Sequence, residues 1–455
     1  FSRIILMTAT PQLSDIQAGS IDQFQINSNS GGGSKDMSAG ITDFRYYESI
    51  LANNITATCV VDETGFQAGD NGRVEASQGT VDGLPIRGGE RTDIDVKDDY
   101  GNRLRLEMYV NRVRNSDPSA TRDFYWLDFV SKEAFANEQS RVTKRYDGKI
   151  SQHVQDILTN VLQTDTSINV DDTAVDYNFI GNNRKPFHVL TWLASKATPQ
   201  TSPGGGTGGS ALGGAAGYFF YQTRDSFEFK SIDVLFQGDP VRKYIKNSGK
   251  PVSGYDANIA TYQLDRDVDV KESLTLGIYN NRTIFFDPIG FKYEVRSFDT
   301  DQQYDRLSTA GNRSKFASNL LPEEFTQSPT RFMSNVLDNG VLPEGINSQA
   351  QLEEWKENPQ HPNYDAPNAM VQSVMRYNQL FSIQMNIVIP GDFTIKAGDL
   401  VECAFQEVGG SQSKRINPET KGIYMVASVC HKLTPADTLT SLSLIRDSYG
   451  QRPSN

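Results

Sequence analysis

Hydrophobic and polar residues alternate with a period of two in the first third of the chain. Every second residue is apolar on both sides of the turn-forming sequence Asp99-Tyr100-Gly101-Asn102: Ile94 and Val96 before it, and Leu104, Leu106 and Met108 after it. This alternation around a turn predicts an antiparallel hairpin. The aromatic run 124–130 predicts a further strand, whereas the apolar residues in 44–51 suit a short amphipathic helix.

The period changes to that of a helix after Gly148. Apolar residues recur at helical spacing, with Ser151 available as the N-cap: Ile150, Val154, Ile157, Leu158, Val161 and Leu162. A second helix is predicted after Pro186, because proline is favoured at the first helical position. A strand pair follows at 218–223 and 226–231, joined by a turn at Arg224-Asp225. Because 218–221 are all aromatic, we expect two of them in the core and two against a neighbouring element or subunit.

Later segments are strand-like again, but they are interrupted. Strands are predicted over 260–295, the segment 297–365 is polar with weak helical patches at 330–337 and 349–355, and 370–377 suits a helix. The tail 380–447 predicts a second all-β block. Such a long polar insertion usually binds a partner.

These patterns predict a mainly β protein in which two antiparallel β blocks flank a small α/β segment. At 455 residues the chain exceeds one hydrophobic core, so we expect three or four domains. The predicted boundaries, in chain order, are a flexible arm 1–40, a first β domain 41–145, an α/β domain 146–236 with a Gly-rich loop 199–217, a second β domain 237–296 plus 366–447, an insertion 297–365 and a tail 448–455.

Composition narrows the classes of function. No apolar run approaches the ~20 residues that span a bilayer, and Ile4-Ile5-Leu6-Met7 is too short for a signal-peptide core. The formal net charge of −12 disfavours tight nucleic-acid binding. Three distant cysteines, Cys59, Cys403 and Cys430, offer neither a disulfide framework nor a zinc ribbon, so we expect small buried hydrophobes.

Candidate chemistry is sparse, and we expect no catalytic residue, cofactor or metal. The acids Asp93, Asp95, Asp98 and Asp99 could form a calcium loop, but they lack the EF-hand glycine and final glutamate, which favours a solvated strand and turn. Neither His153 with Asp156 nor His431 beside Cys430 brings a third metal ligand. The Gly-rich loop lacks the Lys-Ser/Thr ending of a phosphate-binding loop.

One acidic triplet has a sharper interpretation. Asp265, Asp267 and Asp269 alternate, which places them on one face of a predicted strand. The simpler reading is a solvated face. The alternative is that these carboxylates line a channel, where they would let DNA slide without binding.

Residues 150–447 resemble a known family. The resemblance rests on the order of predicted helices and strands from Ile150, and on these motif residues: Asn182, Arg184, Pro186, Phe187, Gly217, Tyr218, Phe220, Asp287, Pro288, Gly391, Gly398, Asp399 and His431. This pattern resembles the baseplate central hub proteins of contractile-tailed phages of the myovirus and cyanophage type. It resembles more distantly the tube part of type VI secretion spike proteins.

The resemblance implies a homotrimer with two tube-like β-barrel domains per chain, which together form a pseudo-sixfold ring. Such a ring would join the sixfold tail tube to the threefold central spike and surround the DNA channel. The implied partners are the tail tube or tube-initiator protein, the spike, the tape-measure protein and the baseplate wedge proteins, with DNA only in transit and no stable membrane association. The implied location is the virion tail baseplate, assembled in the host cytoplasm.

A competing hypothesis from a different class is a β-rich tail protein that binds or degrades surface polysaccharide. That function would need a cleft with paired carboxylates and exposed aromatic residues.

Overall fold

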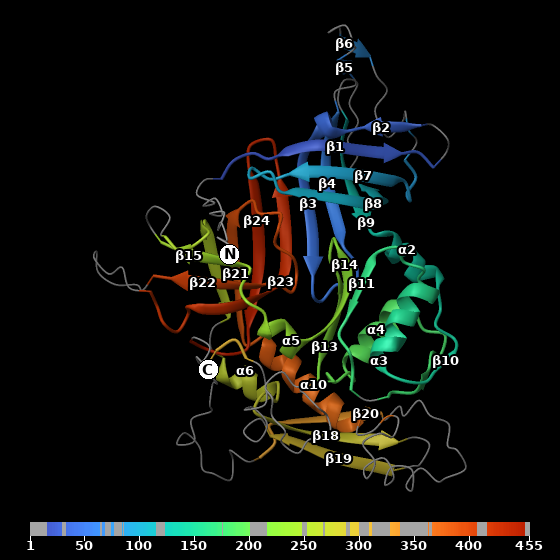
Figure 1. The fold of residues 1–455 in the computed structure, drawn as a ribbon, viewed down its shortest axis with the longest axis vertical. Coiled ribbons are helices and arrows are strands. Elements are labelled where there is room, and N and C mark those ends of the chain that lie inside the picture. The colour runs from blue at the N-terminus through green and yellow to red at the C-terminus, as the bar shows by residue number, and fades with distance from the viewer. Residues whose placement is uncertain are drawn as a thin grey trace, which may run out of the picture.

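The fold is known from a computed structural model, shown in Figure 1. It describes residues 16–29, 33–63, 66–68, 74–76, 84, 86–114, 123–174, 176–200, 216–247, 253–266, 269–287, 292–299, 309–311, 328–336, 363, 366–406 and 416–450. In this part of the chain, strands predominate and helices are few, so the predicted mainly β class with a small α/β insert is confirmed.

The first β block alternates core and surface residues along its strands. Its elements are β1 (Ser20–Asn27), β2 (Ser34–Asp36), a 3-10 turn (Ser38–Gly40), β3 (Ile41–Ser49), β4 (Thr56–Glu63), β5 (Phe66–Ala68), β6 (Val74–Ala76), β7 (Arg91–Lys97), β8 (Arg103–Arg114) and β9 (Asp123–Val130). The predicted hairpin is β7 and β8, where Ile94 pairs with Leu106 and Val96 with Leu104. These four side chains are buried in one core with Phe24, Phe44 and Phe129.

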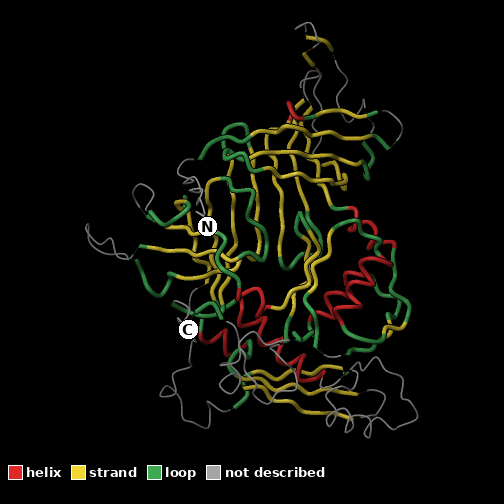
Figure 2. Tube along the Cα trace, viewed as in Figure 1, coloured by secondary structure: helices red, strands yellow, loops and turns green. Residues whose placement is uncertain are grey.

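The α/β part lies beside the sheet (Figures 1 and 2). Its elements are α2 (Lys132–Gln139), β10 (Arg145–Tyr146), α3 (Ile150–Asp156), a π-helical turn (Ile157–Val161), β11 (Ser167–Val170), β12 (Phe179–Ile180), α4 (Pro186–Ala194), β13 (Tyr218–Gln222), β14 (Ser226–Ser231) and α5 (Ile232–Gln237). The predicted strand pair is β13 with β14, and β11 adds to β14 in parallel. All four aromatic residues of β13 are buried, two in the α/β core and two against the neighbouring β block, as expected.

The second β block and its insert complete the chain. Its elements are β15 (Arg242–Lys246), β16 (Ala257–Asn258), β17 (Thr261–Arg266), α6 (Val270–Thr275), β18 (Asn280–Asp287), β19 (Lys292–Asp299), β20 (Arg331–Val336), α10 (Ala366–Leu380), β21 (Ile383–Pro390), β22 (Leu400–Phe405), β23 (Gly422–Leu433) and β24 (Thr438–Arg446). Strands β18, β19 and β20 do not join the main sheet. They form a separate sheet at the lower end of the molecule in Figure 1.

The two β blocks share one sheet. Among the described residues its main path runs β17-β21-β24-β23-β3-β4-β9-β8-β7-β1-β2, and β22, β15 and β16 branch from β23. The 12-residue strand β23 makes this possible, since its first half pairs with β22 and its second half with β3. The predicted domain boundaries stay predictions, but the blocks on either side of them are joined by this pairing.

Three predictions of local structure are wrong. Residues 44–51 were expected to be helical, but β3 covers most of them, because Phe44, Tyr46 and Glu48 alternate into the core. Residues 20–27 of the expected flexible arm form β1, whose Phe24 and Ile26 are fully buried. The expected helix at 330–337 is β20, which pairs in parallel with β18.

Of the other expectations, two helices are confirmed, the N-cap of the first predicted helix is wrong, and two segments lie outside the described residues. Pro186 is the first residue of α4, and α10 covers the helix predicted at 370–377. The N-cap of α3 is Lys149 rather than Ser151, whose hydroxyl instead lies 3.4 Å from the Thr173 amide. The Gly-rich residues 201–215 and the patch at 349–355 lie outside the described residues.

Candidate functional site

The loop between β21 and β22 is where the parts of the molecule meet. We call residues 391–399 the junction loop. Gly391 permits a close approach, because a Cβ there would lie 2.4 Å from Thr438 Cγ2. Gly398 has a φ of +89°, and a Cβ on it would lie 2.3 Å from the Tyr221 hydroxyl. Both positions therefore require glycine.

Two buried aspartates hold the start of the junction loop. Asp98, in the β7–β8 turn, accepts a hydrogen bond from the Phe393 amide at 3.0 Å. Asp392 is fully buried, accepts from the Thr394 amide at 3.0 Å, and pairs with Arg242 of β15 at 2.8 Å. The loop is thereby fixed to the first β block and to its own block.

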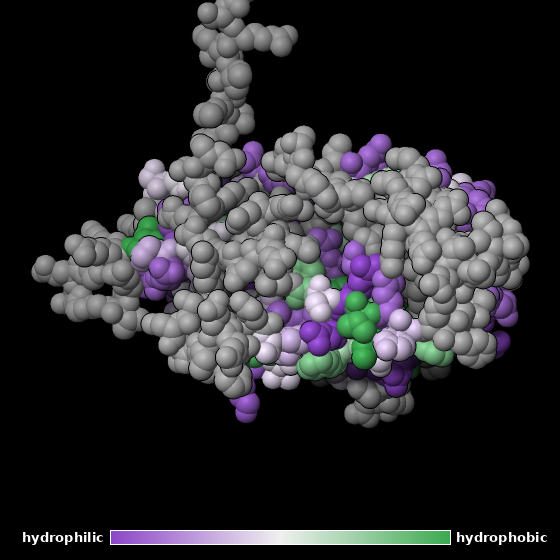
Figure 3. Space-filling view, turned by 90° about the horizontal axis from the view of Figure 1, so that it is seen from below, coloured by the Kyte–Doolittle hydropathy of each residue, from purple (hydrophilic) through white to green (hydrophobic). Residues whose placement is uncertain are grey.

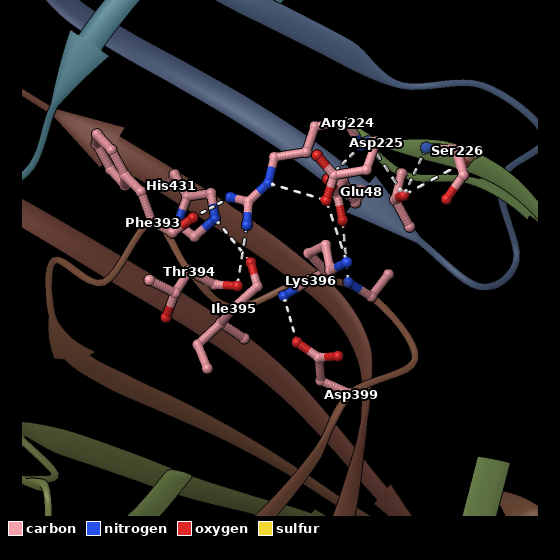
Figure 4. Close-up of polar contacts among 12 residues, drawn as sticks. Glu48, Arg224, Asp225, Ser226, Phe393, Thr394, Ile395, Lys396, Asp399 and His431 are labelled. Atoms are coloured by element: carbon pink, nitrogen blue, oxygen red, sulfur yellow. Dashed lines mark hydrogen bonds and ion pairs between the residues drawn. The ribbon is translucent and has the colours of Figure 1, made fainter. Parts of the chain in front are cut away.

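Glu48 joins three segments through a single carboxylate (Figure 4). Its Oε1 accepts from the Tyr46 hydroxyl and from the Arg224 amide, both at 2.8 Å, and its Oε2 accepts from the Ala397 amide at 3.0 Å. Burial raises the pKa of Glu48, although these hydrogen bonds oppose the shift. Strand β3, the β13–β14 turn and the junction loop are thus tied at one point.

The Arg224 side chain continues the same contact. Its guanidinium donates to the backbone carbonyls of Phe393 and, at 3.0 Å, Thr394. Beside it, Lys396 pairs with Asp225 at 3.1 Å, and the Lys396 amide donates to Asp399 at 2.8 Å. The β13–β14 turn is therefore bonded to the junction loop at Phe393, Thr394 and Lys396, as Figure 4 shows.

His431 of β23 lies beneath the junction loop in its neutral form. Its Nε2 is 3.1 Å from the Ile395 carbonyl, which can only accept, so Nε2 carries the proton. Its Nδ1 then accepts from the Thr440 hydroxyl at 3.0 Å. Burial, and secondarily the charge of Arg224, lower the pKa of His431 to about 4.

This histidine predicts a pH dependence. The folded pKa lies below the unfolded value near 6.5, so the unfolded state binds more protons between pH 6.5 and 4, and stability falls as pH decreases through that window. We expect His431 to account for a loss of about 3 kcal/mol over it. Urea unfolding of the wild type and His431→Gln at several pH values checks this. Parallel profiles for the two proteins would contradict it.

A second buried ion cluster lies near the end of α10. Arg376 is fully buried and pairs with Asp447 at 2.7 Å and with Asp233 of α5 at 3.1 Å. Asp447, just beyond β24, also accepts from the Ala310 amide at 3.0 Å. This cluster fixes α10 to the α/β part and to the second β block.

The exposed face of the main sheet is hollowed into a groove of about 620 Å³. Two rows of paired residues cross it, one of Ser49, Ser428, Ser443, Asn386 and Gln263, and one of Thr56, Tyr47, Cys430, Ser441, Val388 and Thr261. Among the residues that line the groove, Glu48 is the one carboxylic acid. Its carboxylate accepts hydrogen bonds on the core side of the sheet rather than in the groove. The groove therefore presents hydroxyl and amide groups beside apolar ones, and no charged group.

The acidic triplet does not share one strand face. Asp265 is exposed on β17 and accepts a hydrogen bond from Asn386. The strand ends at Arg266, and Asp269 instead caps α6 by accepting from the Glu272 amide at 2.8 Å. Asp267 lies outside the described residues. The prediction that all three share a strand face is thus wrong for Asp269, because a helix begins there.

The motif residues are distributed among several roles. The junction loop brings together Gly391, Gly398, Asp399 and His431, whereas Phe187, Tyr218 and Phe220 are in the α/β core and Gly217 has a φ of +121° beside Ile232. Asn182 and Arg184 lie in the exposed turn before α4, beside a small cavity of about 100 Å³. Asp287 ends β18, and Pro288 lies outside the described residues.

The acids that were considered as a calcium loop pair with other groups of the protein. Asp93 pairs with Arg91 at 2.9 Å and Asp95 with Arg105 at 3.1 Å, while Asp98 holds the turn and the junction loop. Within the described ranges no three His, Cys, Asp or Glu side chains gather as metal ligands. In the same ranges no helix is long and apolar enough to cross a membrane.

The residues that sequence analysis missed are Glu48, Arg224 and Arg376. A charged residue in an otherwise apolar alternation, as at Glu48 between Tyr46 and Ile50, is the one signal that could have identified a buried polar contact. Arg224 was assigned only to a turn, and Arg376 only to a helix.

Comparisons with known proteins show which solved structures have a similar fold. No protein-family model and no curated protein matches the chain. Among solved structures, it is similar to a tail protein from Neisseria meningitidis MC58, with 11% identity and a TM-score of 0.53 over 93% of this chain and 96% of that one. It is also similar to the 43 kDa tail protein of prophage MuSo2 from Shewanella oneidensis, with 11% identity and a TM-score of 0.48 over 96% and 100% of the chains. The expected resemblance to phage tail proteins is therefore confirmed at the level of the fold.

Proposed function

We propose that this chain is a structural subunit of a phage tail baseplate hub, in which three copies form a ring. The ring would join a sixfold tail tube to a threefold spike and surround the passage for DNA. The observation that carries the proposal is the shared main sheet. It presents two β blocks per chain, so three chains would supply six, and among the described strands it ends in β16 and β17 on one side and β2 on the other. Such edges favour pairing with a neighbour.

The groove on the same sheet indicates which side chains would line the passage. The uncharged groove face offers hydroxyl and amide groups, which would neither attract nor repel a phosphate backbone strongly. Asp265 lies at the β17 end of this face, two residues after Gln263 along the strand. We therefore propose that serine, threonine and amide side chains line the passage, with Asp265 at its margin, in place of an acidic triplet.

The partners would be those of a hub: the tail tube or its initiator, the spike, the tape-measure protein and the wedge proteins. The alternative, a polysaccharide-binding or polysaccharide-degrading tail protein, has less support. It needs paired carboxylates in a cleft, and the groove offers only Glu48, which is turned toward the junction loop.

Native mass measurement with electron microscopy tests the proposal. We expect a threefold particle with a central hole for the purified protein at micromolar concentration, or when it is mixed with tail tube and spike proteins of the same phage. A protein that remains monomeric with those partners, or that cleaves a glycan, would contradict the hub function.

Charge in the groove gives a second test. In phage particles that carry Ser441→Lys with Ser443→Lys, we expect DNA release to slow several-fold, because each lysine near the passage attracts phosphate. Release is timed by dye entry in single particles at two salt concentrations, and the effect should weaken at high salt. The control is Ser441→Asn with Ser443→Asn. Equal release rates for the lysine and asparagine particles would show that this face does not line the passage.

A further inference from the structure

The sheet of β18, β19 and β20 has two apolar faces. Its inner face packs on α10, where Phe285 and Phe298 contact Val371 and Met375 in one core cluster. Strand β18 carries the run Ile284-Phe285-Phe286, and so it presents large apolar side chains alternately to both faces. Continuous apolar runs are typical of strands that are covered on both sides. Among the described residues, α10 covers the inner face of this sheet, and none covers the outer face.

The register defines the outer face. Arg282 lies beside Ser297 and Phe332, Ile284 beside Val295 and Ser334, and Phe286 beside Tyr293 and Val336. Six of these side chains are large and apolar, with exposed fractions of 40% for Ile284, 46% for Phe286, 74% for Tyr293, 45% for Val295, 65% for Phe332 and 57% for Val336. Figure 3 views the molecule from this end, where a few hydrophobic residues are visible beside hydrophilic ones.

The exposed area has the size of an interface. Since an aromatic side chain has about 150–250 Å² of surface, the six residues expose on the order of 600 Å². Monomeric soluble proteins rarely expose so large a contiguous apolar patch. A stable protein–protein interface needs about 800 Å² per partner, which this face reaches with its polar residues Arg282, Ser297 and Ser334.

The charge of this face indicates what covers it. Arg282, whose guanidinium lies 5.8 Å from the centre of the Phe332 ring, is the one charged residue of this face among the described side chains. The chain as a whole has 56 acidic and 44 basic side chains and a formal net charge of −12, so acidic groups are in excess over the whole chain. A second copy of this chain therefore offers carboxylates that complement Arg282.

We infer that the outer face of the β18–β20 sheet packs against a second copy of this chain and forms a contact of the proposed ring. This inference rests on the proposed function. Contacts in a ring are head-to-tail, so the face meets a different surface of the next copy rather than itself. Its apolar centre would supply the affinity, and Arg282 would set the orientation.

The test is the mass of the particle in solution. We expect the wild type to be a trimer by mass photometry, and Phe286→Ser with Phe332→Ser to shift the population to monomer by at least tenfold. A second variant, Arg282→Glu, keeps the apolar area but reverses the charge, and should also weaken the trimer. The control Leu51→Ser removes a side chain of similar exposure, 64%, outside this sheet and should stay trimeric. Circular dichroism establishes that each variant is folded.

Footprinting gives an independent measurement. Hydroxyl-radical oxidation of Tyr293 should be several-fold slower in the trimer than in the monomeric double variant. A trimeric double variant with Tyr293 still reactive would overturn the inference and leave the ring intact. Slow oxidation of Tyr293 in the monomer as well as in the trimer would also overturn the inference, because another part of the same chain would then cover the face. A monomeric wild type would instead overturn the ring itself.

Discussion

Replacing Arg376 by methionine should lower the free energy of unfolding by about 3–5 kcal/mol. The guanidinium is fully buried and pairs with Asp233 and Asp447. Methionine fills a similar volume but leaves two carboxylates buried without their cation, and the cost arises from those unpaired charges more than from the lost attraction. Urea unfolding followed by tryptophan fluorescence measures the change.

The matched control for Arg376 is an exposed pair. Arg145 and Asp147 lie 2.8 Å apart with side chains about half exposed, so Arg145→Met should cost less than about 1 kcal/mol. If the loss does arise from unpaired carboxylates, the triple variant Arg376→Met, Asp233→Asn, Asp447→Asn should recover part of it. Similar costs for the buried and the exposed arginine would show that the cluster does not hold α10 in place.

The local elements were predictable where the pattern was clean. Pro186 located the start of α4, and the alternation around Gly101 located β7 and β8. Strand β3 was missed because Tyr46 and Tyr47 are both aromatic, although only Tyr46 points into the core. Strand β20 was missed because its pairing with β18 is long-range and parallel, and no turn in the sequence indicates such a partner.

The junction could be predicted only in part, for a physical reason. Gly391, Gly398 and His431 were selected by resemblance; the structure places both glycines in the junction loop and His431 beneath it, in contact with Ile395. Glu48, which holds the same loop by accepting from the Ala397 amide, lies 349 residues from Ala397 in the chain. Spacing along a sequence encodes contacts within a helix or hairpin, whereas a hydrogen bond between distant segments depends on how the blocks pack. Asp269 was placed on a strand for a different reason: the alternation of Asp265, Asp267 and Asp269 was extended across the start of α6, which Asp269 caps.

Replacing Glu48 by alanine should have the other large effect, a loss of about 4 kcal/mol in the free energy of unfolding. The carboxylate accepts from the Tyr46 hydroxyl and from the Arg224 and Ala397 amides, and each buried donor left without an acceptor costs about 1–3 kcal/mol. Glu48→Gln should cost less, because its one remaining oxygen can still accept from these donors. Glu138→Ala, at an exposed carboxylate on α2, is the control and should cost less than about 1 kcal/mol.

Two measurements separate this role from simple loss of packing. Hydrogen exchange at the Arg224 and Ala397 amides should quicken in Glu48→Ala by more than it does at the β7–β8 hairpin, because these amides lose their acceptor. The pKa of Glu48 is raised in the folded protein, so the folded state binds more protons than the unfolded state above pH 4.5. The wild type should therefore lose stability relative to Glu48→Gln as pH rises from 4.5 through the raised pKa. Two results together would contradict this role: hydrogen exchange that quickens equally throughout the chain in Glu48→Ala, and a difference in free energy of unfolding between the wild type and Glu48→Gln that does not change with pH. They would mean that Glu48 does not hold β3, the β13–β14 turn and the junction loop together.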